Sequence, residues 1–187
     1  MKNKNLVLFI LLFFSVNIKA QFEVGGIKVP YTFKSDETTL VINGAGIREK
    51  YFIDLYVGAL YLKAKGSDAQ KILNADEAMA IKLHIISSMI TSEKMTEATD
   101  EGFKKSTNGN TSPFAAKISQ FKAVFKEKIN KGDVYDIVYE PARGVMIYKN
   151  NKLSSTIAGL DFKKALFGIW LCNQPADSDL KDKMLGK

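Results

Sequence analysis

The residue types that most often carry chemistry are scarce in this sequence. One histidine, His84, and one cysteine, Cys172, occur among 187 residues. A multi-histidine metal centre, a multi-cysteine metal site and an internal disulfide are therefore excluded. The sequence also has no Gly-x-Ser-x-Gly elbow, no phosphate-binding glycine loop and no His-Glu-x-x-His motif. Most metal and nucleophile chemistry is excluded on these grounds, and we expect no metal and no cofactor.

Arg48 is the residue best suited to hold a ligand. It is one of only two arginines in a lysine-rich chain, and it follows segment 43–46, whose two glycines should loosen the backbone. A guanidinium can hold a carboxylate through two parallel hydrogen bonds, which a lysine cannot do. A surface turn in which Arg48 pairs with Glu49 explains the same residues equally well. The local sequence leaves both interpretations of Arg48 open.

Three other features are interpreted as structural. A stripe of apolar residues from Phe114 to Ile129 has the spacing of a helix face that packs in a core. His84 lies in an alternating strand pattern, where a packed histidine is more common than a catalytic one. Asp133 and Asp136 also lie in a strand pattern, and we expect both to be at the surface.

The charge pattern argues against a nucleic-acid partner. The chain has 27 basic and 20 acidic residues, a net charge of +7, and residues 1–20 contribute three of the lysines and no acid. The remainder therefore has a net charge of +4. Nucleic-acid surfaces normally cluster arginines with aromatic residues, whereas these lysines alternate with acids. We interpret them as a solvated surface.

Residues 1–20 have the order of a signal peptide. Lys2 and Lys4 precede nine consecutive apolar residues, 6–14, and the segment ends at the small residue Ala20. Nine residues are too few to cross ~30 Å of hydrocarbon as a helix. A retained membrane anchor is the alternative. We expect residues 21–187 to form one exported domain, periplasmic or secreted, with no stable membrane span once the leader is removed.

The elements that must position Arg48 are predicted from apolar spacing. The odd-numbered residues from 51 to 61 are all apolar, which predicts one fully buried strand face, and the even-numbered face would line a cavity or meet solvent. Further strands are predicted at 38–42, 78–90, 133–140, 145–148 and 153–157. Helices are predicted to begin at Thr91, Ser112–Pro113 and Asp161, with short helices at 68–74 and 180–185. The sequence therefore predicts an α+β domain with an antiparallel sheet covered by helices.

Two segments resemble a known family. Residues 43–62, NGAGIREKYFIDLYVGALYL, are similar to the signature segment of the chalcone isomerase-like family, and residues 162–171, FKKALFGIWL, resemble its exported bacterial branch. The resemblance extends over roughly residues 25–186. It implies an open-faced β-sandwich, in which helices cover one face of a large antiparallel sheet and a ligand cleft lies between them.

The resemblance also implies roles for single residues. In plant chalcone isomerases the arginine that Arg48 matches helps to bind the flavonoid. Tyr56 occupies the position of a threonine of those enzymes, Thr91 and Ala98 occupy those of a tyrosine and an asparagine, and Asp161 falls near that of a further Thr or Ser. Losing one oxyanion donor typically lowers a rate on the order of 10²-fold or more. We therefore expect no catalytic residue and no isomerisation of chalcone.

An arginine and a tyrosine at these two positions resemble the fatty-acid-binding branch, where such a pair holds a carboxylate. The resemblance implies a ligand site of Arg48, Tyr56 and Thr91, with an apolar tunnel for the tail supplied by the strands and by the helix from Phe114 to Phe125. We hypothesise a non-enzymatic domain that binds a small amphipathic carboxylic acid, such as a fatty acid. The alternatives are an intramolecular lyase or isomerase acting on a chalcone-like or other enone substrate, and a structural protein whose cleft is filled.

A site shared by Arg48 and Tyr56 requires a particular path of the backbone. On one straight strand, Arg48 and Tyr56 would lie ~26 Å apart at ~3.3 Å per residue, too far for one carboxylate to contact both. We therefore predict that the chain reverses near Glu49–Lys50 and returns beside residues 40–44.

Overall fold

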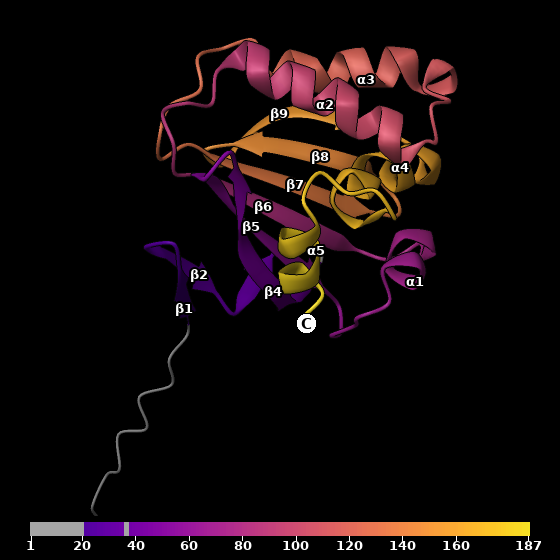
Figure 1. Ribbon diagram of the computed structural model, residues 1–187. Coiled ribbons are helices and arrows are strands. Elements are labelled where there is room, and N and C mark those ends of the chain that lie inside the picture. The colour runs from indigo at the N-terminus through magenta and orange to yellow at the C-terminus, as the bar shows by residue number, and fades with distance from the viewer. Residues whose placement is uncertain (1–20, 36–37) are drawn as a thin grey trace, which may run out of the picture.

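The computed structural model describes residues 21–35 and 38–187 (Figure 1). The predicted signal peptide, residues 1–20, lies outside the described residues. Seven strands form one antiparallel sheet in the order of the sequence: β3 (Thr32–Lys34), β4 (Thr39–Lys50), β5 (Ile53–Leu62), β6 (Met79–Ile85), β7 (Val134–Glu140), β8 (Gly144–Lys149) and β9 (Lys152–Ile157). A separate hairpin consists of β1 (Gln21–Val24) and β2 (Ile27–Pro30).

Helices cover one face of the large sheet. They are α1 (Ala69–Asn74), α2 (Ser92–Ser106), α3 (Ala115–Lys122), α4 (Leu160–Leu171) and α5 (Ser178–Met184), and short 3-10 turns, Ser112–Phe114 and Ala123–Phe125, flank α3. Figure 1 shows α2, α3 and α4 along the same side of the sheet, with α5 beside β4. The predicted starts at Asp68, Thr91 and Pro113 are confirmed, because Asp68 and Thr91 are the N-caps of α1 and α2 and Pro113 stands in the turn before α3.

Both faces of β5 are buried from Tyr56 onward, against different partners. Tyr56 and Leu60 face the main core beneath the helices, whereas Val57 and Tyr61 face a smaller core shared with the β1–β2 hairpin. The predicted buried face is therefore wrong at its start. Tyr51 is exposed because it lies in the turn before β5, and the even-numbered residues provide the face that meets the helices.

Two further expectations need correction. Asp133 and Asp136 are buried rather than at the surface, and Asp136 forms an ion pair of 2.5 Å with Lys82 that compensates its charge. Asp161 does not cap α4, since the cap residue is Gly159. Asp161 lies in the first turn instead, where its carboxylate accepts a hydrogen bond from the Phe162 backbone N–H at 2.7 Å.

Segment 43–46 is not loose backbone but the middle of β4, and its glycines allow α5 to approach closely. A Cβ atom added to Gly44 would lie 2.0 Å from the carbonyl oxygen of Lys183. The neighbouring Asn43 side chain is buried and donates to the carbonyl of Met184 at 2.7 Å and to that of Gly66 at 2.9 Å. The C-terminal helix is thus attached to β4 a few residues before Arg48.

Gly44→Ala should displace α5, because its methyl group would overlap backbone that cannot rotate away. We expect a loss of about 1–3 kcal/mol in the free energy of unfolding, measured by denaturant titration. Gly66→Ala is the matched control, since its Cβ would meet only the end of the Ile72 side chain at 3.8 Å. Equal stability of the two variants would contradict this account of the glycine.

Candidate functional site

The β4–β5 hairpin brings Arg48 and Tyr56 together. The two residues are direct cross-strand partners, so their side chains project from the same face of the sheet. The predicted reversal is confirmed, with its tip at Tyr51–Phe52 because Lys50 still pairs with Ile53. A bulge follows the Arg48–Tyr56 pair, since the next partners are Glu49 and Asp54. Bulges re-aim side chains locally, and this one lies directly beside the site.

Tyr56 links Arg48 to the last long helix. Its hydroxyl oxygen accepts a hydrogen bond from Trp170 Nε1 of α4 at 2.9 Å and a longer one from Arg48 Nη1 at 3.4 Å. The Arg48 guanidinium carbon also lies 5.7 Å from the centroid of the Tyr56 ring. Tyr56 is 2% exposed. Because the oxygen is occupied as an acceptor from both sides, the hydroxyl hydrogen is left to donate to a third group.

Arg48 is a cation without a carboxylate partner in the described part of the chain. No Asp or Glu oxygen of residues 21–35 and 38–187 lies within 4.0 Å of its guanidinium, and its buried Nε–H donates to none of their atoms. Burial disfavours its charge, but Tyr56 and the more distant Asp177 and Glu101 hold its pKa above the ordinary value. The interpretation as a surface turn paired with Glu49 is therefore wrong.

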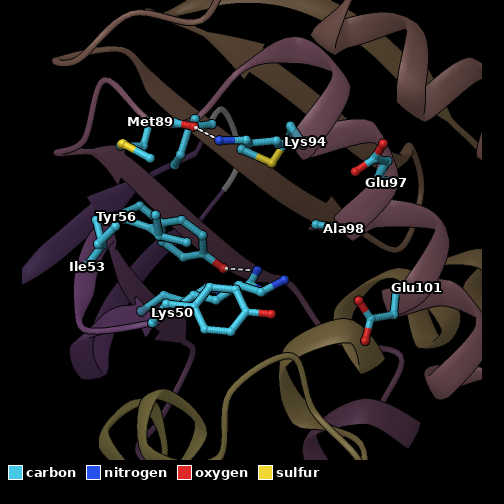
Figure 2. Close-up of a pocket in the computed structure, with 13 residues that line it drawn as sticks. Lys50, Ile53, Tyr56, Met89, Lys94, Glu97, Ala98 and Glu101 are labelled. Carbon is cyan, nitrogen blue, oxygen red and sulfur yellow. Dashed lines mark hydrogen bonds between the residues drawn. The ribbon is translucent and has the colours of Figure 1, made fainter.

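A cavity of about 310 Å³ opens in front of this pair, between the hairpin and α2 (Figure 2). Its apolar lining includes Ile53, Leu55, Met89, Ile90 and Met95. Figure 2 shows the Tyr56 hydroxyl pointing into the space that Ala98 and Glu101 of α2 close from the other side. The cavity thus has a polar end at Arg48 and Tyr56 and a mostly apolar lining, which also includes the charged residues Lys50, Lys94, Glu97 and Glu101.

The predicted tunnel between the sheet and the phenylalanine helix is not present as an open space. Behind Arg48 and Tyr56 the gap measures about 20 Å³, which is room for about one water molecule. Phe121 and Phe125 fill the region, with ring centroids 5.3 Å apart and edge-to-face geometry. The stripe is core packing, as the spacing predicts, and the apolar walls available to a ligand come from the hairpin and from residues 89–95.

A model of the chalcone isomerase-like family matches residues 20–186. The chain belongs to the chalcone isomerase-like family. Among solved structures it is similar to a fatty-acid binding protein from Arabidopsis thaliana, with 16% sequence identity and a TM-score of 0.68 over 86% of this chain and 92% of that chain. At that identity the similarity shows a shared fold, and it confirms the predicted α+β class with its large antiparallel sheet. No curated protein matches the chain.

The structure does not bring Thr91, the third residue suggested by the family resemblance, to the cavity beside Arg48 and Tyr56. Thr91 is exposed and caps α2, with its side chain accepting from the Lys94 N–H at 3.2 Å and donating to Glu93 at 3.3 Å. The cavity lining does not include it. Ala98 does line the cavity and offers no side-chain hydrogen bond there.

Two parts of this site carry no signal in the sequence. Nothing local distinguishes a tryptophan that binds a tyrosine, as Trp170 does, from one that merely packs. Glu101 stands among the other charged residues of α2, and no motif marks it. It lies at the cavity edge, where a hydrogen bond and the charge of Lys105 lower its pKa and keep it ionised.

The described residues offer little for other chemistry. Within 21–35 and 38–187 no three His, Cys, Asp or Glu side chains are grouped so as to hold a metal ion. In the same ranges no helix combines the length and the apolar character needed to cross a bilayer.

Tyr56→Phe should destabilise the protein, because it leaves the buried Trp170 N–H and one Arg48 donor without their acceptor. The expected loss is about 1–3 kcal/mol in the free energy of unfolding, measured by denaturant titration. Tyr31→Phe makes the same chemical change at an exposed tyrosine and should alter stability by less than about 0.5 kcal/mol. If both variants unfolded like the wild type, the Tyr56 hydroxyl would not organise the site.

Proposed function

We propose that the protein is a non-catalytic binding domain for a small amphipathic carboxylic acid, such as a fatty acid. The ligand carboxylate binds Arg48 and Tyr56, and its apolar tail lies against the cavity walls. One observation carries the proposal. A partly buried guanidinium has no carboxylate partner among the described residues, and it stands at one end of a cavity whose lining is mostly apolar.

The energetics of the unpaired guanidinium support an anionic ligand. A charge removed from water is costly unless it is paired, and within the described chain Arg48 donates only one long hydrogen bond, to the Tyr56 hydroxyl oxygen. A ligand carboxylate would accept from the unused guanidinium donors and from the free Tyr56 hydrogen at once. Charge-assisted bonds of this type are about twice as strong as neutral ones.

The cavity also limits the tail. A volume of about 310 Å³ is at the lower end of the range for small-molecule sites, ~300–1,000 Å³. The inner gap of about 20 Å³ cannot receive an alkyl chain without movement of Phe121 or Phe125. A short or medium chain therefore suits the cavity, or a longer one whose end emerges at its mouth. The similar Arabidopsis structure, named as a fatty-acid binding protein, supports a lipid ligand.

The proposal that the domain is not an isomerase relies on what surrounds Arg48. Ala98 supplies no donor to the cavity, and Thr91 is occupied as a helix cap away from it. Ring closure of an enone needs donors placed around a developing oxyanion, and here Arg48 and Tyr56 act at one end only. Export to the periplasm or the medium is proposed from the composition of residues 1–20.

Arg48→Met should weaken binding of dodecanoate about 10- to 100-fold, the factor expected when hydrogen bonds to a charged group are lost. Arg48→Lys keeps the charge without the fork and should fall between this variant and the wild type. Arg143→Lys, at the other arginine, is the control and should leave the dissociation constant unchanged. Isothermal titration calorimetry measures all four proteins.

The ligand's own head group gives an independent check. Dodecanol has the same tail but no charge, so wild-type protein should bind it much more weakly than dodecanoate. Equal affinity for acid and alcohol, or unchanged binding by Arg48→Met, would contradict the carboxylate site. Turnover of chalcone in a spectrophotometric assay would contradict the non-catalytic assignment and favour the isomerase alternative.

A further inference from the structure

Two aromatic residues at the β4–β5 turn are almost fully exposed. Tyr51 is 82% exposed and Phe52 is 96% exposed. Ile53, at 36%, and Met89, at 48%, are also among the exposed large apolar residues. We call these four residues the tip patch. Single exposed apolar residues are common on soluble proteins, but a group of them gathered at one point is not.

The backbone does not explain the aromatic residues of this turn. Tyr51 and Phe52 have φ angles of 52° and 61°, in the left-handed region that bulky side chains disfavour. The β8–β9 hairpin has the same two-residue geometry, with φ angles of 51° and 65°, and uses Asn150 and Asn151 there. Asparagine and glycine are the ordinary residues of such turns. Backbone preference therefore does not account for the two aromatic rings, and most of their surface faces solvent.

The tip patch is continuous with the mouth of the cavity. Tyr51, Ile53 and Met89 line that cavity, and Phe52 stands next to them without lining it. In Figure 2, Ile53 and Met89 lie on one side of the cavity and Glu97 and Glu101 on the other. An apolar molecule that enters or leaves on the side of Ile53 and Met89 meets the tip patch first.

We propose that the tip patch inserts into the interfacial layer of a lipid bilayer, so that the cavity opens toward the membrane. Aromatic side chains beside lysines are the residues that settle at the headgroup level. Lys50 lies 5.5 Å from the centroid of the Tyr51 ring, and Lys94 lines the adjacent cavity. The inference goes beyond the head-group site, because it concerns a surface that works without a bound ligand.

A bilayer suits this surface better than a protein partner or a second copy. Two aromatic side chains provide ~150–250 Å² each, whereas a stable protein interface needs ~800 Å² from each partner. Insertion into lipid has no such requirement, since each side chain contributes on its own. Glu97 and Glu101 line the same cavity as Lys50 and Lys94 and offset their charges, so the attachment should depend on apolar contact and should persist at ~1 M salt.

A tryptophan placed in the tip patch tests the proposal directly. The one native tryptophan, Trp170, is buried, so Phe52→Trp adds a single exposed reporter. With vesicles of phosphatidylcholine and phosphatidylglycerol, its emission should shift to shorter wavelength, and brominated lipids should quench it. Leu153→Trp is the matched control, at a leucine of β9 that is 47% exposed, and should show neither effect. Absence of both signals from Phe52→Trp would overturn the proposal.

A second variant measures how much the ring contributes. Phe52→Asn adopts the residue type of the β8–β9 turn, so the fold should be at least as stable as in the wild type. Its binding to the same vesicles should fall roughly 10-fold or more, as expected for withdrawing one aromatic side chain. Leu153→Asn should bind like the wild type. Association of the protein with itself in the absence of vesicles, abolished by Phe52→Asn, would instead assign the patch to a second copy.

The head-group variant separates this inference from the proposed function. Arg48→Met should lose dodecanoate and still bind vesicles, whereas Phe52→Asn should retain dodecanoate and lose vesicles. Loss of vesicle binding by Arg48→Met would show that attachment depends on the ligand site, and it would overturn the inference as stated.

Discussion

The site depends on one constraint, which is that Arg48 is held near Tyr56 without a carboxylate partner in the described chain. A partly buried cation is costly unless hydrogen bonds hold it in place. Here Arg48 donates to the Tyr56 hydroxyl, which also accepts a hydrogen bond from Trp170 of α4. The hairpin sets the two side chains opposite each other, and the helix sets the orientation of the tyrosine. An ion pair to Glu49 would satisfy Arg48 and remove the reason for it to bind anything else.

The rest of the fold fills the space behind Arg48 and Tyr56. The C-terminal helix lies against Gly44, and Phe121 and Phe125 occupy the interior behind Tyr56. The open volume therefore lies at the edge of the core, between the β4–β5 hairpin and α2, and it is accessible to solvent. A ligand bound in this cavity would lie at the edge of the core and not inside it. This placement makes the residues around the cavity mouth as important as those at its polar end.

The sequence predicts the fold class from local patterns, because alternating apolar residues identify the strands. The pairing of Arg48 with Tyr56 comes from the family resemblance, and the reach of a strand adds that such a pair requires a reversal between positions 48 and 56. Several of the failures are tertiary. Gly44 appears flexible until α5 is placed on it, Asp136 appears to be at the surface until Lys82 pairs with it, and Trp170 shows no role until its helix lies against Tyr56. The role of each of these three residues depends on which distant segment packs against it, and the periodicity of the sequence does not carry that information.

The two hairpin turns show how function is separated from folding in this chain. Both turns have two residues with positive φ, so both require the left-handed backbone conformation. Only the β8–β9 turn has asparagine, which adopts that conformation readily, at both positions. At the β4–β5 turn bulky residues occupy this strained conformation three and four residues after Arg48. A conflict between local preference and the observed residue is expected where the residue serves something other than stability. The exposed rings and a guanidinium without a carboxylate partner in the described chain are two such conflicts on one hairpin, and Arg48 and Tyr51 line the same cavity.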